Sequence, residues 1–342
     1  MKDQKNTEDD SKAASNIKSH IRDAFGLLQE RYSSRLTPAE IEASRKAAGL
    51  PPRDPAQEPE KIVYPTHSSG FRDIDIMMGS GFEGGQLILV GGYTAAGKTA
   101  LVSSIVMNTI AKGDALPILF FQKKHRPTDL AIRFISSHAK INLGRMFSGR
   151  FLDYDWPHLQ RTAATLHRAN INIYSGNHGG LIDISEIEDE IAHFKSENDM
   201  GLVVVDSLQD FCSHITSAEE KHLAHTSMCY RLKALAAKHD VPVLLTSSIN
   251  STIEKRNTYD KRPSIGDLVG VAGNAADIAD AVLFIHRPAM FCPHCIARDG
   301  SCTAMHDRLA EIVIAKQNNG PTGIVELSFY GAHLGFETAE EE

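Results

Sequence analysis

The chain has 342 residues, of which 42% are hydrophobic and 23% are charged, a composition that suits a folded globular protein with one large domain. Its formal net charge of −7 excludes a general attraction to nucleic acid, so any such binding needs a local basic patch. The polar N-terminus and the lack of any apolar run of membrane-spanning length predict a cytoplasmic protein without membrane contact.

The first 62 residues are predicted to stand apart from the rest. Residues 1–14 are polar and are expected to form a disordered tail behind Met1, which we expect to be the natural start. Residues 15–49 have helical periodicity and are predicted to form a short helical arm. Residues 50–62 are rich in proline and charge, which is typical of a linker.

Residues 63–342 alternate between apolar runs and helical stretches, which predicts an α/β domain. Strands are expected at 86–91, 117–121, 171–174, 201–206, 242–247, 280–285, 310–315 and 323–329. Helices are expected near 100–111, 127–138, 183–196 and 218–239. This order predicts a mainly parallel, twisted sheet with helices on both faces. The last two strands follow each other directly and should form a closing hairpin.

A complete phosphate-binding loop lies between the first of these strands and the helix that follows. It reads Gly92-Tyr93-Thr94-Ala95-Ala96-Gly97-Lys98-Thr99, with Ala100 opening the helix. The glycines let backbone N–H groups curl around phosphate oxygens, and the helix N-terminus favours negative charge. Lys98 is predicted to reach the outer phosphates and Thr99 to ligate Mg²⁺, so the loop predicts ATP binding.

A second nucleotide motif is predicted at Asp206, where the apolar run from Leu202 to Val205 ends in a carboxylate. At the carboxyl end of a buried strand beside the phosphate loop, Asp206 would hold the magnesium ion or its water shell. Asp206 alone is weak evidence for a nucleotide site, and the phosphate-binding loop earlier in the chain makes that evidence stronger.

From residue 64 to about 337 the chain resembles the RecA-like ATPase domain of DnaB-type replicative helicases. Several segments carry this resemblance in order: Gly70-Phe71-Arg72-Asp73-Ile74-Asp75, Asp206-Ser207-Leu208-Gln209, Ser247-Ser248-Ile249-Asn250, Lys261-Arg262-Pro263 with Asp267-Leu268, and Lys316-Gln317-Asn318-Asn319-Gly320-Pro321-Thr322-Gly323. The resemblance implies a RecA-like P-loop fold and a ring, usually a hexamer. It also implies ATP at subunit interfaces and single-stranded DNA in the central channel.

The sequence departs from the family pattern at positions that the resemblance marks as catalytic. Lys124 stands where the family has the general-base glutamate, and His125 is a candidate substitute or a simple surface histidine. Ser248 replaces the sensor glutamine, and Asn318 replaces the arginine finger. Lys316 remains and could contact a γ-phosphate across an interface. Hydrolysis is therefore in doubt, although phosphate binding should be intact.

The two loops that would face DNA differ in charge. The loop at 210–216 has no lysine or arginine, whereas the second loop carries Lys255, Arg256, Lys261 and Arg262. These four cations would either contact phosphates of single-stranded DNA or form an ordinary solvated basic loop.

A cysteine cluster follows the strand that ends near residue 285. Cys292, Cys295, Cys302 and His306 have the spacing of a tetrahedral zinc site, with His294 as an alternative fourth ligand. The insert 288–308 is therefore predicted to be a zinc-binding hairpin, and a loop with reactive free thiols is the alternative.

Two functions follow from these patterns. The first is a DnaB-like, ATP-binding helicase-family protein that acts on single-stranded DNA in replication as a ring. The second is a hydrolysis-impaired regulator or assembly factor that partners a replicative helicase or its loader. Another RecA-fold ATPase, such as a recombinase, is disfavoured by the motifs at 261–263 and 319–323.

Overall fold

The computed structural model describes residues 14–16, 66–112, 117–175, 183–197, 201–256, 260–268, 272–297, 306 and 308–339. Within these ranges no helix combines the length and apolar content that a membrane crossing requires.

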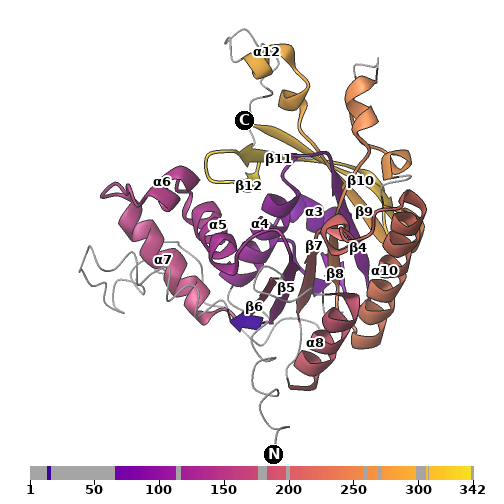
Figure 1. The fold of residues 1–342 in the computed structure, drawn as a ribbon. Helices are drawn as coiled ribbons and strands as arrows, with labels where there is room; N and C mark the ends of the chain where they lie inside the picture. The colour runs from indigo at the N-terminus through magenta and orange to yellow at the C-terminus, as the bar shows by residue number, and fades with distance from the viewer. Residues whose placement is uncertain are drawn as a thin grey trace, which may run out of the picture.

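A single large sheet forms the centre of the protein (Figure 1). Among the described residues it has ten strands, in the order β1-β6-β5-β7-β8-β4-β9-β10-β11-β12. The strands are β1 Ala14–Asn16, β4 Leu87–Gly92, β5 Ile118–Gln122, β6 Ile171–Ser175, β7 Leu202–Asp206, β8 Val243–Ser248, β9 Ala281–His286, β10 Leu309–Gln317, β11 Gly323–Tyr330 and β12 Gly335–Thr338. The inner strands from β6 to β9 are parallel, and β1 and β10 to β12 are antiparallel. A small separate sheet pairs β2 Thr66–His67 with β3 Phe82–Glu83.

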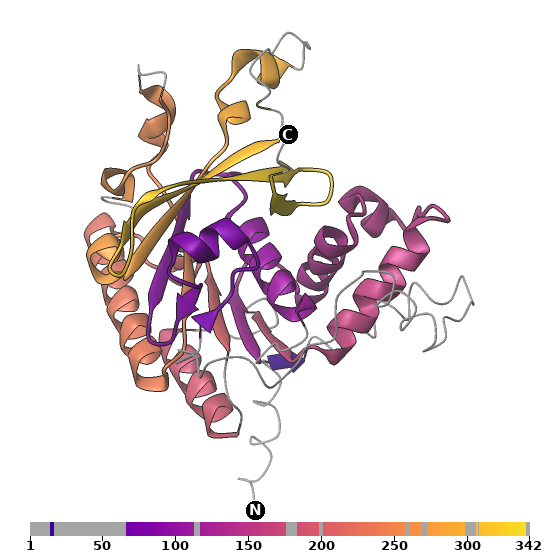
Figure 2. The same cartoon turned by 180° about the vertical axis from the view of Figure 1, so that it is seen from behind.

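Helices cover both faces of the sheet, as Figures 1 and 2 show. One group packs α4 Lys98–Ala111 with α5 Pro127–Ala139, α6 Leu143–Ser148 and α7 Asp155–Arg168, and the other packs α8 Ile184–Glu197 with α10 Ala218–His239 and α11 Ala275–Ile278. Among the described residues the remaining helices are α3 Arg72–Met77, α9 Leu208–Phe211 and α12 Pro293–Ala297, and the short 3₁₀ helices are η3 Ser251–Lys255, η4 Ile265–Leu268 and η5 Pro288–Met290. The predicted two-faced α/β fold is confirmed.

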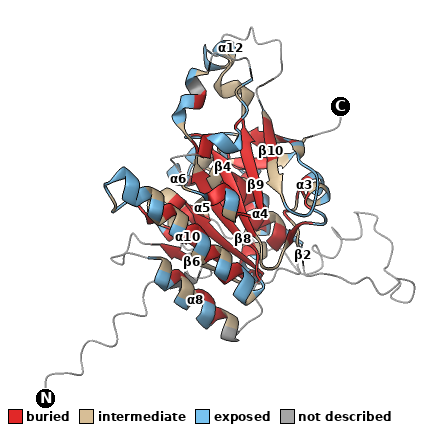
Figure 3. Cartoon of the chain, turned by 90° about the vertical axis from the view of Figure 1, so that its right-hand side faces the viewer, coloured by how far each residue is buried: buried red, intermediate tan, exposed pale blue. Residues whose placement is uncertain are grey.

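The core lies along the parallel strands because both of their faces are covered. Residues Leu87 to Val90 of the central strand β4 are fully buried. Figure 3 shows the same pattern, with buried residues concentrated in the strands and exposed residues on the outer sides of α8 and α10. The closing hairpin predicted for the last strands is present as β10 and β11, and β12 extends it.

The N-terminal region is described only at β1. Its backbone pairs antiparallel with β6, with Ser15 opposite Ile173. The prediction that residues 15 and 16 begin a helix is therefore wrong, because their backbone groups pair with the otherwise open edge of β6. Ala14, placed by the sequence in the disordered tail, also belongs to this strand. The rest of the tail, the arm at 17–49 and the linker at 50–62 lie outside the described residues.

Candidate nucleotide site and metal-binding cluster

The phosphate-binding loop connects β4, which ends at Gly92, to α4, which begins at Lys98. Gly97 has a φ of 108°, a backbone conformation that glycine adopts without strain. A Cβ at this position would also lie 3.1 Å from the Phe336 ring. Thr94 and Ala95 are exposed at the tip of the loop, whereas Ala96 is buried beneath it. The predicted loop residues thus form one turn that opens a fourteen-residue helix.

The Lys98 side chain folds back over this turn. Its Nζ donates hydrogen bonds to the carbonyl oxygens of Gly92 at 2.9 Å and Tyr93 at 3.1 Å. Burial lowers the pKa of Lys98 to about 8, against the opposing effect of the Asp206 carboxylate. A half-buried ammonium group at the rim of a phosphate loop is suited to bind the negative charge of a polyphosphate.

Thr99 and Asp206 lie together although 107 residues separate them in sequence. The Thr99 hydroxyl donates to Asp206 Oδ2 at 2.6 Å, and the buried Thr246 hydroxyl donates to the other carboxylate oxygen. Asp206 is 7% exposed. A hydroxyl and a carboxylate at one point beside a phosphate loop are the oxygen ligands that Mg²⁺ prefers, so these residues fit the predicted magnesium site.

The turn after β5 carries Lys124 and His125 next to this site. Gln122 pairs with Asp206 across the parallel strands, and its buried side chain accepts a 2.6 Å hydrogen bond from the His125 backbone N–H. Lys124 is exposed, and its charge contributes to the lowered pKa of both Lys98 and His125. Burial is the main cause for His125, whose imidazole is therefore neutral at pH 7. His125 is half-buried rather than a free surface side chain.

Ser248 ends β8 directly beside the phosphate loop, opposite Gly92. Its backbone N–H donates to Gln209 Oε1 at 3.0 Å, and Gln209 Nε2 donates to Ser247 Oγ at 2.9 Å. Gln209 from α9 therefore fixes the end of the strand. In the sequence Gln209 is visible only as part of a family motif, and its bridging role could not be predicted because Ser247 and Ser248 lie 38 and 39 residues away.

Lys316 lies far from the phosphate loop of the same chain. It pairs with Val282, which pairs with Leu89, three residues before Gly92 and thus roughly 10 Å back along the sheet. Its Nζ donates to the carbonyl oxygens of three residues in and just after α11, which are Ala276, Asp277 and Ala279. The predicted catalytic residues therefore divide into Lys98, Thr99 and Asp206 at one site and Lys316 elsewhere.

Asn318 is held beside Asp280 at the same remote edge. Its side-chain amide donates to Asp280 Oδ1 at 3.2 Å, and its backbone N–H donates to the Asp280 carbonyl at 3.0 Å. The same carboxylate pairs with Lys233 at 2.7 Å. Asn318 therefore cannot act on the nucleotide of its own chain.

Three of the four cations in the predicted DNA loop have partners within the chain. Lys261 donates a hydrogen bond to the Arg256 carbonyl. Arg262 forms a bidentate ion pair with the buried Glu311 carboxylate, in which Nε and Nη2 donate to the two carboxylate oxygens at 2.6 and 2.7 Å. Arg256 pairs with buried Asp267. Lys255 is exposed. The loop is thus anchored to the core by its arginines, which leaves them less available for phosphate contacts than the sequence suggests.

Three of the predicted metal ligands converge. The ligand atoms of Cys292, Cys295 and His306 all lie within 4.8 Å of one another. The alternative ligand His294 is exposed and is not part of this group among the described residues. Cys302 lies outside the described residues. Two thiols and an imidazole at this separation fit Zn²⁺, which takes sulfur and nitrogen ligands.

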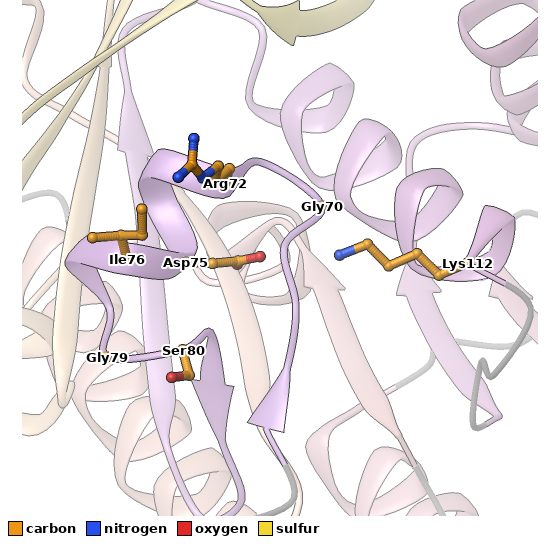
Figure 4. Close-up of a pocket in the computed structure, with 7 residues that line it drawn as sticks. All are labelled: Gly70, Arg72, Asp75, Ile76, Gly79, Ser80 and Lys112. Atoms are coloured by element: carbon orange, nitrogen blue, oxygen red, sulfur yellow. The ribbon is translucent and has the colours of Figure 1, made fainter. Parts of the chain in front are cut away.

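A cavity of about 540 Å³ lies near the start of the domain (Figure 4). Its walls include Gly70 and Asp75 from the motif that precedes β3, and Lys112 after the end of α4. Asp75 and Lys112 point toward one another, and both hydrogen-bond to Ser68. Because α4 spans about 20 Å, this cavity is remote from the phosphate loop, and its polar groups fasten the segment before β3 to α4.

The domain model for the DnaB-like helicase C terminal domain matches residues 67–338. The chain belongs to this family. It is 29% identical over 272 residues to the replicative DNA helicase DnaB of Geobacillus stearothermophilus, covering 80% of this chain and 56% of that protein. It is 32% identical over 279 residues to a probable replicative DNA helicase of Trieres chinensis, covering 81% and 58%. The chain thus matches little more than half the length of these relatives.

Solved structures agree with the fold. One solved ATPase domain superposes with a TM-score of 0.70 at 21% identity, covering 90% of this chain and all of that one. A DnaB-like replicative helicase studied with its primase superposes with a TM-score of 0.68 at 22% identity, covering 94% of this chain and 71% of that one. The RecA-like fold expected from the family resemblance is therefore confirmed.

Proposed function

We propose that the protein binds ATP with Mg²⁺ and acts on single-stranded DNA in replication, in the cytoplasm, as one subunit of a ring. The observation that carries this proposal is the 2.6 Å hydrogen bond from the Thr99 hydroxyl to Asp206 Oδ2, which lies beside Lys98 on a complete phosphate loop. Family membership supports the class of activity. Mg²⁺ bound by Thr99 and Asp206 would neutralise phosphate charge, while Lys98 and the N-terminus of α4 would hold the phosphates.

A ring, expected to be a hexamer, is supported by the position of Lys316. This lysine is remote from the phosphate loop of its own chain, so any contact with a γ-phosphate must be made with the nucleotide of a neighbouring subunit. Binding of single-stranded DNA is supported by the exposed Lys255 and by the family, and weakened by the internal pairs of Arg256 and Arg262.

The second candidate function is that of an ATP-binding regulator that hydrolyses ATP slowly or not at all, and Lys124 favours it. An exposed lysine stands beside the phosphate site where the family resemblance implies a carboxylate base, and an ammonium group cannot accept a proton from water. In that case the protein would serve as an ATP-bound regulator or assembly factor for a replicative helicase or its loader. His125, neutral at pH 7, is the alternative proton acceptor.

Steady-state ATP hydrolysis, with and without single-stranded DNA, separates the two candidates. Lys98→Ala serves as the control that removes the phosphate contact, and binding of a fluorescent ATP analogue is measured in parallel. DNA-stimulated turnover that the control abolishes supports the motor, and loss of that turnover in His125→Ala would identify the base. Tight binding without turnover supports the regulator. Absence of nucleotide binding would refute both.

We further propose that the insert 288–308 binds a structural zinc ion through Cys292, Cys295 and His306, with Cys302 as the fourth ligand. The convergence of the first three supports this assignment. With four protein ligands the ion would have no open coordination position for a substrate, and it would stabilise the hairpin. Zinc content of the purified protein tests it: one equivalent is expected, falling in Cys292→Ser, and no zinc in the unaltered protein would refute the site.

A further inference from the structure

The insert 288–308, called the cysteine hairpin below, is described at 288–297, 306 and 308, and its first residues lie directly against the phosphate loop. Tyr93, inside the loop, is 2% exposed and packs its ring edge-on against Phe291 at a centroid distance of 5.0 Å. Phe291 immediately precedes the metal-site residue Cys292, and the two backbone N–H groups share the Pro288 carbonyl as acceptor. The turn that carries Cys292 therefore also carries the aromatic ring that packs against Tyr93.

Arg287 makes a second connection between the hairpin and the loop. Its backbone N–H donates to the Tyr93 hydroxyl at 2.6 Å, and that hydroxyl donates to the Arg287 carbonyl at 3.3 Å. The guanidinium donates to the Ala95 carbonyl at 3.3 Å and lies 3.9 Å from the Phe329 ring centroid. Both ends of the segment Tyr93 to Ala95 are thus held by residues that lead into the metal cluster.

In its described residues the hairpin has little secondary structure of its own, although Met290 and Phe291 pack against the core. Its helical elements, η5 and α12, have three and five residues, and neither contains a buried residue. Helices of this length are unstable without tertiary support, and metal binding commonly supplies the ordering free energy of such small elements. Phe291 also stacks on His286 at a centroid distance of 5.6 Å, so the metal would restrict the position of Phe291 further rather than set it alone.

We propose that metal bound at Cys292, Cys295 and His306 braces the phosphate loop through Phe291 and Arg287, so that metal and nucleotide bind cooperatively. The metal orders the hairpin, and the ordered hairpin fixes Tyr93 and Ala95 in the shape that receives phosphates. This inference rests on the proposed zinc and ATP sites and adds a regulatory link between them. Tyr93, Arg287 and Phe291 are positioning residues in this scheme.

The experiment measures the affinity of the full chain for a fluorescent ATP analogue with Mg²⁺, after zinc loading and after treatment with a zinc-selective chelator. We expect the stripped protein to bind the nucleotide at least about five-fold more weakly, the lower end of typical coupling between sites. Because coupling is reciprocal, saturating nucleotide should strengthen zinc binding by the same factor in a chelator competition.

Two variants test whether the coupling between metal and nucleotide passes through Phe291. Phe291→Ala should keep its zinc while its nucleotide affinity becomes insensitive to the metal. Ile296→Ala, on α12 and 64% exposed, should behave like the unaltered chain. Equal nucleotide affinity with and without zinc, or full metal dependence in Phe291→Ala, would overturn the brace while leaving both binding sites intact. If zinc or nucleotide does not bind at all, the proposed function and the brace are both overturned. Thermal unfolding of the zinc-stripped protein is the control that establishes that it remains folded.

Discussion

Replacing Lys124 by glutamate should accelerate ATP hydrolysis. The pairing of Gln122 with Asp206 and the hydrogen bond between Gln122 and His125 hold the intervening turn beside the proposed magnesium site. A carboxylate there can orient and deprotonate water, which is worth roughly 10²–10⁴ in rate for a positioned base. The change also removes a positive charge that lowers the pKa of Lys98 and adds a negative charge beside the phosphates, so ATP affinity should fall and the rate must be measured at saturation.

Single-turnover hydrolysis with the protein in saturating excess over ATP is the assay, with Lys124→Gln as the control that removes the charge without supplying a base. We expect Lys124→Glu to exceed this control by about 10²-fold, the low end for general-base catalysis. The rate should still lie below that of a complete motor, because an arginine finger contributes about 10³–10⁵ and Asn318 supplies none.

Adding Asn318→Arg tests whether the two defects are coupled. Asp280 already pairs with Lys233, which limits capture of the new arginine within its own chain. Equal rates for Lys124→Glu and Lys124→Gln in both the original and the Asn318→Arg background would refute the assignment of Lys124 to the base position.

Two further predictions concern the phosphate loop. Affinity for an ATP analogue should be constant below pH 8 and fall by up to about tenfold per unit above it, because only the ammonium form of Lys98 attracts phosphate and its pKa is about 8. Equilibrium titrations from pH 7 to 10 check this, and a flat profile would contradict it; Lys98→Met should bind weakly at every pH. Gly97→Ala should lower stability by about 1–2 kcal/mol through its positive φ, with a further loss from the Phe336 contact. Gly149→Ala is the control, because Gly149 has a φ of +69° and a Cβ there would meet nothing within 4 Å, so its loss of stability reports the backbone strain alone. Equal losses of stability in the two variants, measured by thermal unfolding, would show that the Phe336 contact is unimportant.

Much of the fold could be predicted because its strands are parallel and buried on both faces. Such strands are apolar throughout, and the run at 86–91 appears in the structure as Leu87–Gly92. The helix α10 was predicted at its observed bounds. The helix α7 was missed because Pro157 lies in its first turn and its apolar residues are sparse, and the four-residue strand β12 was too short to give a pattern.

The candidate site was predictable where chemistry is local in sequence and less so where it depends on packing. Lys98 and Thr99 are specified by the loop motif, and the strand ending in Asp206 supplied its partner. The internal use of Arg262 was not predictable, because Glu311 lies 49 residues away and meets it only through the pairing of β10. The contact of Phe291 with Tyr93 likewise depends on β9 lying next to β4.

The substitutions have a common physical consequence. Lys98, Thr99 and Asp206 would bind the nucleotide before reaction, and all three are present, whereas the family residues that Lys124 and Asn318 replace would act only in the transition state. A site of this kind favours binding over turnover. A ligand that binds the assembled form stabilises it by an amount that grows with the ratio of ligand concentration to Kd, so ATP that is held without hydrolysis would maintain an assembly instead of cycling it. A ring that also contains complete helicase subunits would tolerate such a member, since motion would come from its neighbours.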